Sequence, residues 1–280
     1  MEQKPFFSII IPTYDRKDFL KIALGSVLKQ TFSDYEAIVV DDGSTDNTKE
    51  IVKALKNKKL NYFYQKNKGP AAARNKGIKK ANGKFICFLD SDDRFCREKL
   101  EITHQYIKQY PNYKVFHTEE IWYRNGRLLS EKKYHKKPAG HVFTQALKLC
   151  CISPSTTVIK RSVFSKIGLF DSNLPVCEDY DLFLRLTSKY PVFLIPKHLT
   201  IKEGGHSDQQ SKKYPSIDTF RIYALEKILK NGKLSNTDYL ATYRELKQKC
   251  TIYIKGAIKR NKLKEANEYR RLIAKYKKNL

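Results

Sequence analysis

Three carboxylates lie within four residues of one another in this 280-residue chain, at Asp90, Asp92 and Asp93. Carboxylates packed this closely repel one another and are costly to desolvate unless a cation neutralises them. A hard divalent metal ion with phosphate oxygens as further ligands is the natural occupant of such a cluster. A polar turn that ends a strand has the same composition. The cluster alone therefore leaves a metal site and a structural turn both open.

The elements that must position this cluster are legible in the first third of the chain. An apolar run at 84–89 directly precedes the cluster and predicts a short strand buried on both faces. Three other strands and three helices alternate before it, at 8–14, 18–29, 35–40, 51–55, 60–65 and 69–81. Such alternation predicts an α/β fold with parallel pairing, a Rossmann-like nucleotide-binding sheet flanked by helices. Ligands of such sheets bind at the carboxyl ends of the strands, where the cluster lies. The Gly-rich dinucleotide fingerprint and the P-loop are both absent from the sequence.

The rest of the chain divides into a mixed segment and a helical one. Helices are predicted at 98–110, 161–167 and 178–189, and strands at 114–125, 156–159 and 192–195. From residue 214 onward the apolar spacing is helical only. We therefore expect one unit over residues 1–213 and a helical extension over residues 214–280.

The chain is strongly basic, with a net charge of +26 and 41% hydrophobic residues. Residues 211–280 carry 19 Lys and Arg against 6 Asp and Glu, an excess of 13. Such a tail suits nucleic acid, anionic lipid or an acidic polymer, although a Lys-rich composition by itself also explains part of the charge. No interleaved aromatic and basic motif of the known nucleic-acid-binding folds is present, so nucleic acid is not the expected partner.

Six cysteines show no Cys-x-x-Cys spacing, which indicates reduced, packed thiols rather than a disulfide framework or a zinc site. No apolar stretch approaches the length of a membrane span. The N-terminal residues lack the basic and apolar regions of a signal peptide. These observations together predict a cytoplasmic location.

Five sequence blocks, in this order, resemble family 2 glycosyltransferases of the GT-A fold: residues 8–13, 39–48, 69–75, 88–93 and 178–182. The resemblance covers about residues 6–210 and says nothing of the tail. It implies a nucleotide-binding half over about 6–93 and an acceptor-binding half over about 94–213. A sixth block, Gly-Gly-His-Ser-Asp-Gln-Gln-Ser at 204–211, resembles the motif with which a subset of these enzymes closes the site.

The resemblance implies an inverting, metal-dependent transfer of a sugar from a nucleotide-sugar donor, expected to be a UDP-sugar. The acceptor would be a hydroxyl of a glycan or of a lipid-linked glycan, and the setting cell-surface polysaccharide or lipopolysaccharide synthesis. It also implies nucleotide contacts by Pro12, Thr13, Tyr14, Asp42, Arg74 and Asp90. Asp42 would accept a hydrogen bond from a uracil N3–H, and Asp41 beside it would be structural. Tyr14 would stack on the base or pack in the core.

For the metal, Mn²⁺ or Mg²⁺, the resemblance implies Asp92 as the direct ligand and Asp90 as a ligand to the ribose or to metal-bound water. Asp93 could exchange roles with either of them, or it could cap the next helix. His206 in the sixth block would complete the metal–diphosphate site, since neutral imidazole is a competent ligand.

For catalysis, the resemblance implies Asp179 as the base that takes the acceptor proton, with Glu178 orienting it or touching the acceptor. The simpler alternative is a pair of acids favoured by the N-terminus of a helix. A catalytically inactive scaffold of the same fold, and a basic nucleic-acid or membrane-surface binding protein, are the alternative functions. If the chain is an enzyme, its basic tail could hold it peripherally on the anionic inner face of the membrane, where lipid-linked acceptors lie.

Overall fold

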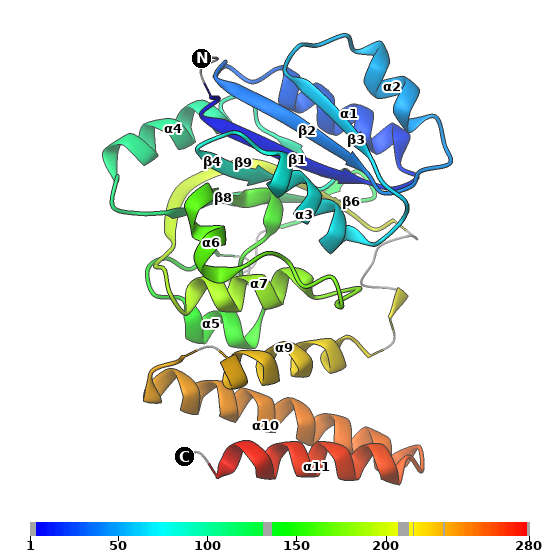
Figure 1. The fold of residues 1–280 in the computed structure, drawn as a ribbon, viewed down its shortest axis with the longest axis vertical. Coiled ribbons are helices and arrows are strands. Elements are labelled where there is room, and N and C mark those ends of the chain that lie inside the picture. The colour runs from blue at the N-terminus through cyan, green and yellow to red at the C-terminus, as the bar shows by residue number, and fades with distance from the viewer. Residues whose placement is uncertain (1–3, 131–135, 207–212, 215, 232, 279–280) are drawn as a thin grey trace.

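The computed structural model describes residues 4–130, 136–206, 213–214, 216–231 and 233–278. Within these residues a nine-stranded mixed sheet is covered by helices on both faces, and three further helices are stacked against one end of the molecule (Figure 1). The predicted α/β class is confirmed.

The first half is a parallel sheet with the predicted alternation. Its strands are β1 (Phe7–Thr13), β2 (Tyr35–Asp41), β3 (Leu60–Tyr64) and β4 (Phe85–Phe88), and its helices are α1 (Lys17–Leu28), α2 (Thr48–Ala54) and α3 (Pro70–Lys80). The strands lie in the order β3-β2-β1-β4, and all of their pairings are parallel. All residues of β1 and β4 are buried, because helices cover both faces of the central strands.

The second half extends the same sheet with mixed directions. Its strands are β5 (Arg94–Phe95), β6 (Val115–Arg124), β7 (Arg127–Leu128), β8 (Thr157–Lys160) and β9 (Phe193–Gly204), and its helices are α4 (Lys99–Gln109), α5 (Phe143–Lys148), α6 (Phe164–Ile167) and α7 (Glu178–Thr187). β8 runs antiparallel to both β4 and β6, whereas β9 runs parallel to β6.

The strand predicted at 192–195 is much longer in the structure, since β9 continues to Gly204. The predicted strand ends at residue 195, directly before Pro196, which cannot donate a hydrogen bond to a neighbouring strand. The structure passes this residue through register shifts on either side of Glu119 in β6, after which regular pairing resumes. The continuation matters because it carries the end of β9 to the carboxyl end of β4.

The last three helices are α9 (Ile217–Asn231), α10 (Asn236–Lys259) and α11 (Leu263–Lys277). They do not stand apart from the sheet unit, because α5 and α7 share one hydrophobic cluster with them. Leu184 of α7, Leu225 of α9 and Leu246 of α10 are buried in this cluster. The helical character of the tail is confirmed, and the domain boundary at 213/214 stays a prediction. None of the described helices is both long enough and apolar enough to cross a bilayer.

A buried lysine lies in the second half of the sheet. Lys99 begins α4 with a fully buried side chain, and its Nζ donates to Thr200 Oγ1 at 2.9 Å. Desolvation lowers the pKa of Lys99 to about 8.

Replacing this lysine should change how stability depends on pH. Between pH 8 and 10.5 Lys99 is neutral in the folded protein but still protonated in the unfolded chain. The free energy of unfolding of the wild type therefore increases as the pH rises through this range. In Lys99→Met this gain is absent. Urea unfolding of both proteins at pH 7 and pH 10 should show the wild type gaining roughly 2 kcal/mol relative to the variant. A difference that is constant with pH would contradict the assignment.

Candidate active site

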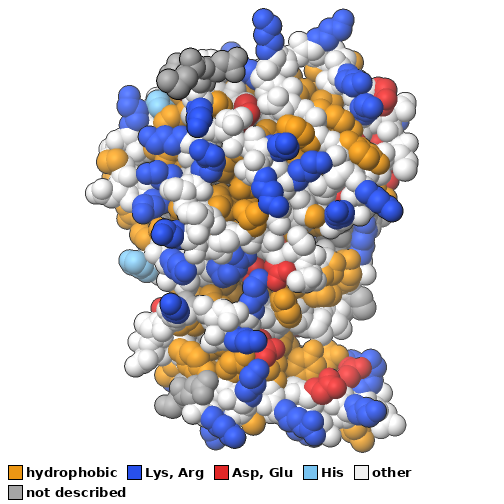
Figure 2. Space-filling view, in the orientation of Figure 1, with side chains coloured by type: hydrophobic (Ala, Val, Ile, Leu, Met, Phe, Trp, Pro, Cys, Tyr) orange, Lys and Arg blue, Asp and Glu red, His pale blue; other side chains and the backbone are white. Residues whose placement is uncertain are grey.

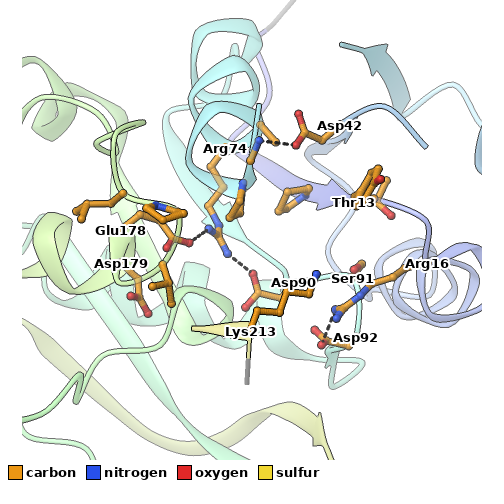
Figure 3. A pocket seen from close by; sticks show the side chains of 18 of the residues that line it. Thr13, Arg16, Asp42, Arg74, Asp90, Ser91, Asp92, Glu178, Asp179 and Lys213 are labelled. Atoms are coloured by element: carbon orange, nitrogen blue, oxygen red, sulfur yellow. Dashed lines mark hydrogen bonds and ion pairs between the residues drawn. The ribbon is translucent and has the colours of Figure 1, made fainter. Parts of the chain in front are cut away.

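A cavity of about 1060 Å³ opens at the carboxyl ends of the parallel strands. Loops after β1, β2 and β4, the start of α3, the start of α7 and the end of β9 all contribute to it (Figure 3). The predicted site residues that line it are Pro12, Thr13, Tyr14, Asp42, Arg74, Asp90, Asp92, Asp93, Glu178 and Asp179. Residues that the sequence places up to 167 positions apart therefore share one cavity.

Arg74 joins the two halves of this cavity. It lies in α3, which begins after Gly69 at φ 86° and has Pro70 in its first turn. Its Nη2 donates to Asp90 Oδ1 at 2.7 Å and its Nη1 to Glu178 Oε1 at 2.6 Å (Figure 3). The side chain is only 7% exposed. The guanidinium thus joins the loop directly after β4 to the start of α7 through two ion pairs.

This ion triad perturbs the acids that it joins. Burial by itself raises the pKa of Asp90, but Arg74 and then Lys202 outweigh it, so the pKa lies below its ordinary value. Burial raises the pKa of Glu178 to about 7, opposed by Arg74 and reinforced by Asp179. Glu178 therefore exchanges its proton near neutral pH, and Asp90 stays ionised.

Asp93 is the most enclosed acid of the cluster. Its Oδ2 accepts from Ser155 Oγ at 2.5 Å and from Lys202 Nζ at 2.6 Å, and its Oδ1 accepts from the Glu203 backbone N–H at 3.4 Å. Both carboxylate oxygens are thus occupied by the protein. This geometry supports a structural role that anchors the cluster to β9.

Asp92 is held by one partner only among the contacts described, the Arg16 guanidinium at 2.8 Å. Its side chain is 16% exposed and lines the cavity. The described residues contain no cluster of three or more His, Cys, Asp and Glu side chains that could hold a metal by themselves. One or two carboxylates completed by phosphate oxygens is the way in which Mg²⁺ is usually bound. Asp92 with Asp90 fits such a cation, and the geometry favours Asp92 over Asp93.

One side of the cavity is formed by the loops after β1 and β2. Asp42 accepts the backbone N–H groups of Lys68 at 3.0 Å and Gly69 at 2.7 Å, so it shapes the loop before α3. Tyr14 is 44% exposed and lies outside the core. Thr13 Oγ1 and Arg74 Nε are buried polar atoms that lack a hydrogen-bond partner in the described part of the chain. Two such orphaned groups in one cavity indicate a bound polar ligand.

Asp41 has the structural role expected of it. Its Oδ1 accepts from the Ser44 backbone N–H at 2.8 Å, and its Oδ2 accepts from the Tyr62 hydroxyl at 2.5 Å. One oxygen thus holds the polar loop that follows β2, and the other ties the end of β2 to β3.

Asp179 lies across the cavity at the second position of α7. Its Oδ1 accepts from the Tyr180 backbone N–H at 2.7 Å, and its Oδ2 accepts from the Cys150 thiol at 3.3 Å. Cys177, the residue before α7, has φ 63°, a left-handed turn that sets the start of the helix. The residue is half-buried and lines the cavity, where a base for an incoming hydroxyl would have to lie.

His206 is not among the residues that line the cavity. Its Nε2 lies 3.2 Å from the Glu203 carbonyl oxygen, and its ring lies 4.4 Å from that of Phe19. Residues 207–211 of the same block lie outside the described residues. The role of His206 as a metal ligand stays a prediction.

Several cavity residues carry no motif in the sequence. Lys202 lies in the part of β9 beyond Pro196, and its Nζ lies 5.6 Å from the centre of the Trp122 ring. Arg16 and Tyr214 also line the cavity, from the loop after β1 and from the segment before α9. The spacing of these residues gives no signal, because only the pairing of distant strands brings them together.

Comparisons with known proteins agree with this geometry. The family model for glycosyl transferase family 2 matches residues 8–168. An uncharacterized glycosyltransferase of Rickettsia conorii is 36% identical over 211 residues, which is 74% of this chain and 35% of that protein. This chain therefore spans about a third of the length of that relative. TuaG of Bacillus subtilis, a glycosyltransferase named for teichuronic acid biosynthesis, is 31% identical over 66% of this chain and 73% of its own.

WcaA of Escherichia coli, named for colanic acid biosynthesis, is 29% identical over 198 residues, 68% of this chain and 69% of its own. Among solved structures, S. aureus TarS 1–349 in complex with UDP-GlcNAc superposes with a TM-score of 0.71 at 25% identity, over 88% of this chain and 71% of TarS. The mannosyltransferase PcManGT of Pyrobaculum calidifontis, in complex with GDP-Man and Mn²⁺, shares the fold with a TM-score of 0.60 at 15% identity, over 98% and 85% of the two chains. With a family match over more than half of its length, a GT-A fold and the family's acids gathered in one cavity, the chain belongs to glycosyltransferase family 2.

Proposed function

We propose that this protein is an inverting, metal-dependent glycosyltransferase that moves a sugar from a UDP-sugar to a hydroxyl of a glycan or lipid-linked acceptor. The observation that carries the proposal is the Arg74 bridge, which joins Asp90 after β4 to Glu178 at the start of α7, beside Asp179, within one cavity. The relatives named for teichuronic acid and colanic acid biosynthesis support a role in cell-surface polysaccharide synthesis. The UDP-GlcNAc complex of TarS supports a UDP donor.

The reaction needs a single displacement. The acceptor oxygen forms a bond to the anomeric carbon while the bond from that carbon to the diphosphate oxygen breaks, and Asp179 takes the acceptor proton. Glu178 fixes the position of Arg74, and Arg74 in turn keeps Asp90 ionised. Thr13 Oγ1 and Arg74 Nε are free to donate to the donor. Arg16 and Lys202 also line the cavity, and their charge would favour the departing diphosphate.

Asp92, with Asp90 beside it, would hold the Mn²⁺ or Mg²⁺. When bound, such an ion neutralises charge on the diphosphate as it leaves. Asp93 would support these two acids through Ser155 and Lys202 rather than bind the ion itself. The PcManGT complex with Mn²⁺ supports this choice of metal.

We place the enzyme in the cytoplasm, peripherally on the inner face of the membrane. All six cysteines are described and are free thiols, which suits a reducing compartment. Nucleic acid is not a proposed partner.

Calorimetric titration of UDP, GDP, CDP and dTDP, each with and without Mn²⁺, tests the donor site. We expect metal-dependent binding of UDP to the wild type and its loss by at least ~10-fold in Asp92→Ala, because one carboxylate ligand is removed. Asp18→Ala, an exposed acid in α1 outside the cavity, is the matched control and should bind as the wild type does.

Two other results would count against the proposal. If none of the four nucleotides binds, the assignment of the cavity as a nucleotide-sugar site is wrong. If UDP binds but no UDP-sugar is turned over with or without glycan acceptors, the protein is an inactive scaffold of the same fold.

A further inference from the structure

The outward face of α10 is basic over its last four turns. With 3.6 residues per turn, the exposed positions from 244 to 259 fall on an arc of about 140°. These positions, which we call the α10 face, are Arg244, Lys247, Gln248, Thr251, Ile252, Lys255, Ile258 and Lys259. They include four cations and no acid. Figure 2 shows Lys and Arg side chains along this end of the molecule, over α10 and α11.

Two acids close to this face, Glu245 and Glu265, are engaged elsewhere, whereas Glu268 of α11 is exposed. Glu245, which is on α10 itself, is buried with its carboxylate 3.3 Å from Lys249. Glu265 at the start of α11 accepts from Lys262 at 2.8 Å and from the Tyr253 hydroxyl at 2.7 Å. The cations of the α10 face are therefore not neutralised by the carboxylates nearest to them in sequence.

Two large aliphatic side chains stand among these cations. Ile252 is 59% exposed and Ile258 is 44% exposed, and Leu263 at the start of α11 is 55% exposed. Exposed aliphatic groups beside Lys and Arg suit the surface of an anionic membrane, where cations meet the headgroups and apolar side chains enter the interface. The face holds no aromatic side chain on which bases could stack, which disfavours single-stranded nucleic acid. A second copy of the same face would be repelled by its like charge.

We propose that the α10 face docks on an anionic lipid bilayer, with its lysines at the headgroups and Ile252 and Ile258 among the upper acyl carbons. This rests on the proposed function in one respect, since it names the surface on which a lipid-linked acceptor would be met. Lys213 and Tyr214, just before α9, line the rim of the active-site cavity. The helices that carry the docking face thus follow directly on a part of the chain that lines the cavity.

Vesicle co-sedimentation with the full chain tests the proposal. The probes are phosphatidylcholine vesicles with and without 30% phosphatidylglycerol. We expect binding to the anionic vesicles only, weakening as salt rises from 0.05 to 0.5 M. The triple variant Lys247→Glu, Lys255→Glu and Lys259→Glu should lower the partition coefficient by at least ~100-fold, because each lysine close to an anionic surface strengthens binding roughly fivefold.

A charge-reversal control elsewhere on the surface distinguishes the effect of the α10 face from the effect of net charge. Lys49, Lys53 and Lys58 are exposed in and after α2, at the other end of the molecule. Changing all three to Glu lowers the net charge from +26 to +20, as the α10 variant does. This control should bind vesicles nearly as the wild type does. Ile252→Ser with Ile258→Ser should keep low-salt binding but lose ~10-fold of the binding that survives at 0.5 M salt.

Three results would overturn the proposal: an α10 variant that binds like the wild type, equal losses in both charge reversals, or binding to RNA or acidic peptide without binding to anionic vesicles. UDP titration of every variant keeps this outcome separate from the proposed function. If UDP binding persists while vesicle binding never occurs, only the docking surface is wrong. If vesicle binding follows the α10 face but UDP does not bind, only the transferase assignment is wrong.

Discussion

Asp179→Asn should lower the turnover of donor and acceptor by ~10³-fold while leaving UDP affinity unchanged. The amide has the same shape as the carboxylate. Its oxygen can still accept from the Tyr180 backbone N–H and its NH2 group then donates to the Cys150 sulfur, but it cannot take the acceptor proton. General-base contributions of this kind are typically 10²–10⁴-fold. Steady-state rates with a UDP-sugar and a glycan acceptor, together with calorimetric UDP binding, measure both effects.

The control for this variant is Cys150→Ser, which keeps a hydrogen-bond donor beside Asp179 and should stay within about threefold of the wild-type turnover. An Asp179→Asn enzyme that retains more than a tenth of the wild-type rate would show that the base is another group. A fall in UDP affinity would indicate instead that Asp179 holds the donor.

Arg74→Met should destabilise the protein by about 3–5 kcal/mol at pH 8. The methionine fills much of the same space but leaves Asp90 and Glu178 without their shared cation, and uncompensated buried charges are costly. The loss should depend on pH. In the wild type the pKa of Asp90 is lowered, so its contribution to stability is present above the unfolded pKa and disappears as the pH falls through the folded value.

In the variant, burial is no longer opposed by Arg74, so the pKa of Asp90 rises from its lowered value and the pKa of Glu178, already about 7 in the wild type, rises further. Their folded-state protonation then favours the native state at low pH, and this contribution disappears as the pH rises through the raised values. Urea unfolding should therefore show a smaller deficit at pH 5 than at pH 8. Lys275→Met is the control, because Lys275 and Glu226 form a surface ion pair, 58% and 33% exposed, and such pairs contribute little to stability. Equal deficits for the two variants, or a deficit that is constant with pH, would contradict the central role of Arg74.

The sequence by itself determined the chemistry and the first half of the fold. Apolar runs such as 8–14 and 84–89, each closed by polar turn residues, predict buried strands because local pattern and burial coincide there. The acids stand directly after these strands or at the start of a helix, so their assembly follows from the rule that parallel strands present their carboxyl ends at one edge. For this reason the residue order alone places Asp42, Asp90 and Asp92 in one cavity, whereas Asp179, at the start of a helix, is expected there only from the resemblance to the family.

Only the tertiary structure decided how these acids are partnered. Arg74 and Glu178 are 104 residues apart, and Lys202 and Asp93 are 109 residues apart. No local pattern encodes such contacts, because they depend on which strands pair and in which direction. The course of β9 past Pro196 carries Lys202 to Asp93, while His206 comes to lie against Phe19 rather than in the cavity lining. Which acid is buried, which is paired and which faces the ligand is set by packing, since burial and neighbouring charge rather than residue type determine the cost of each carboxylate.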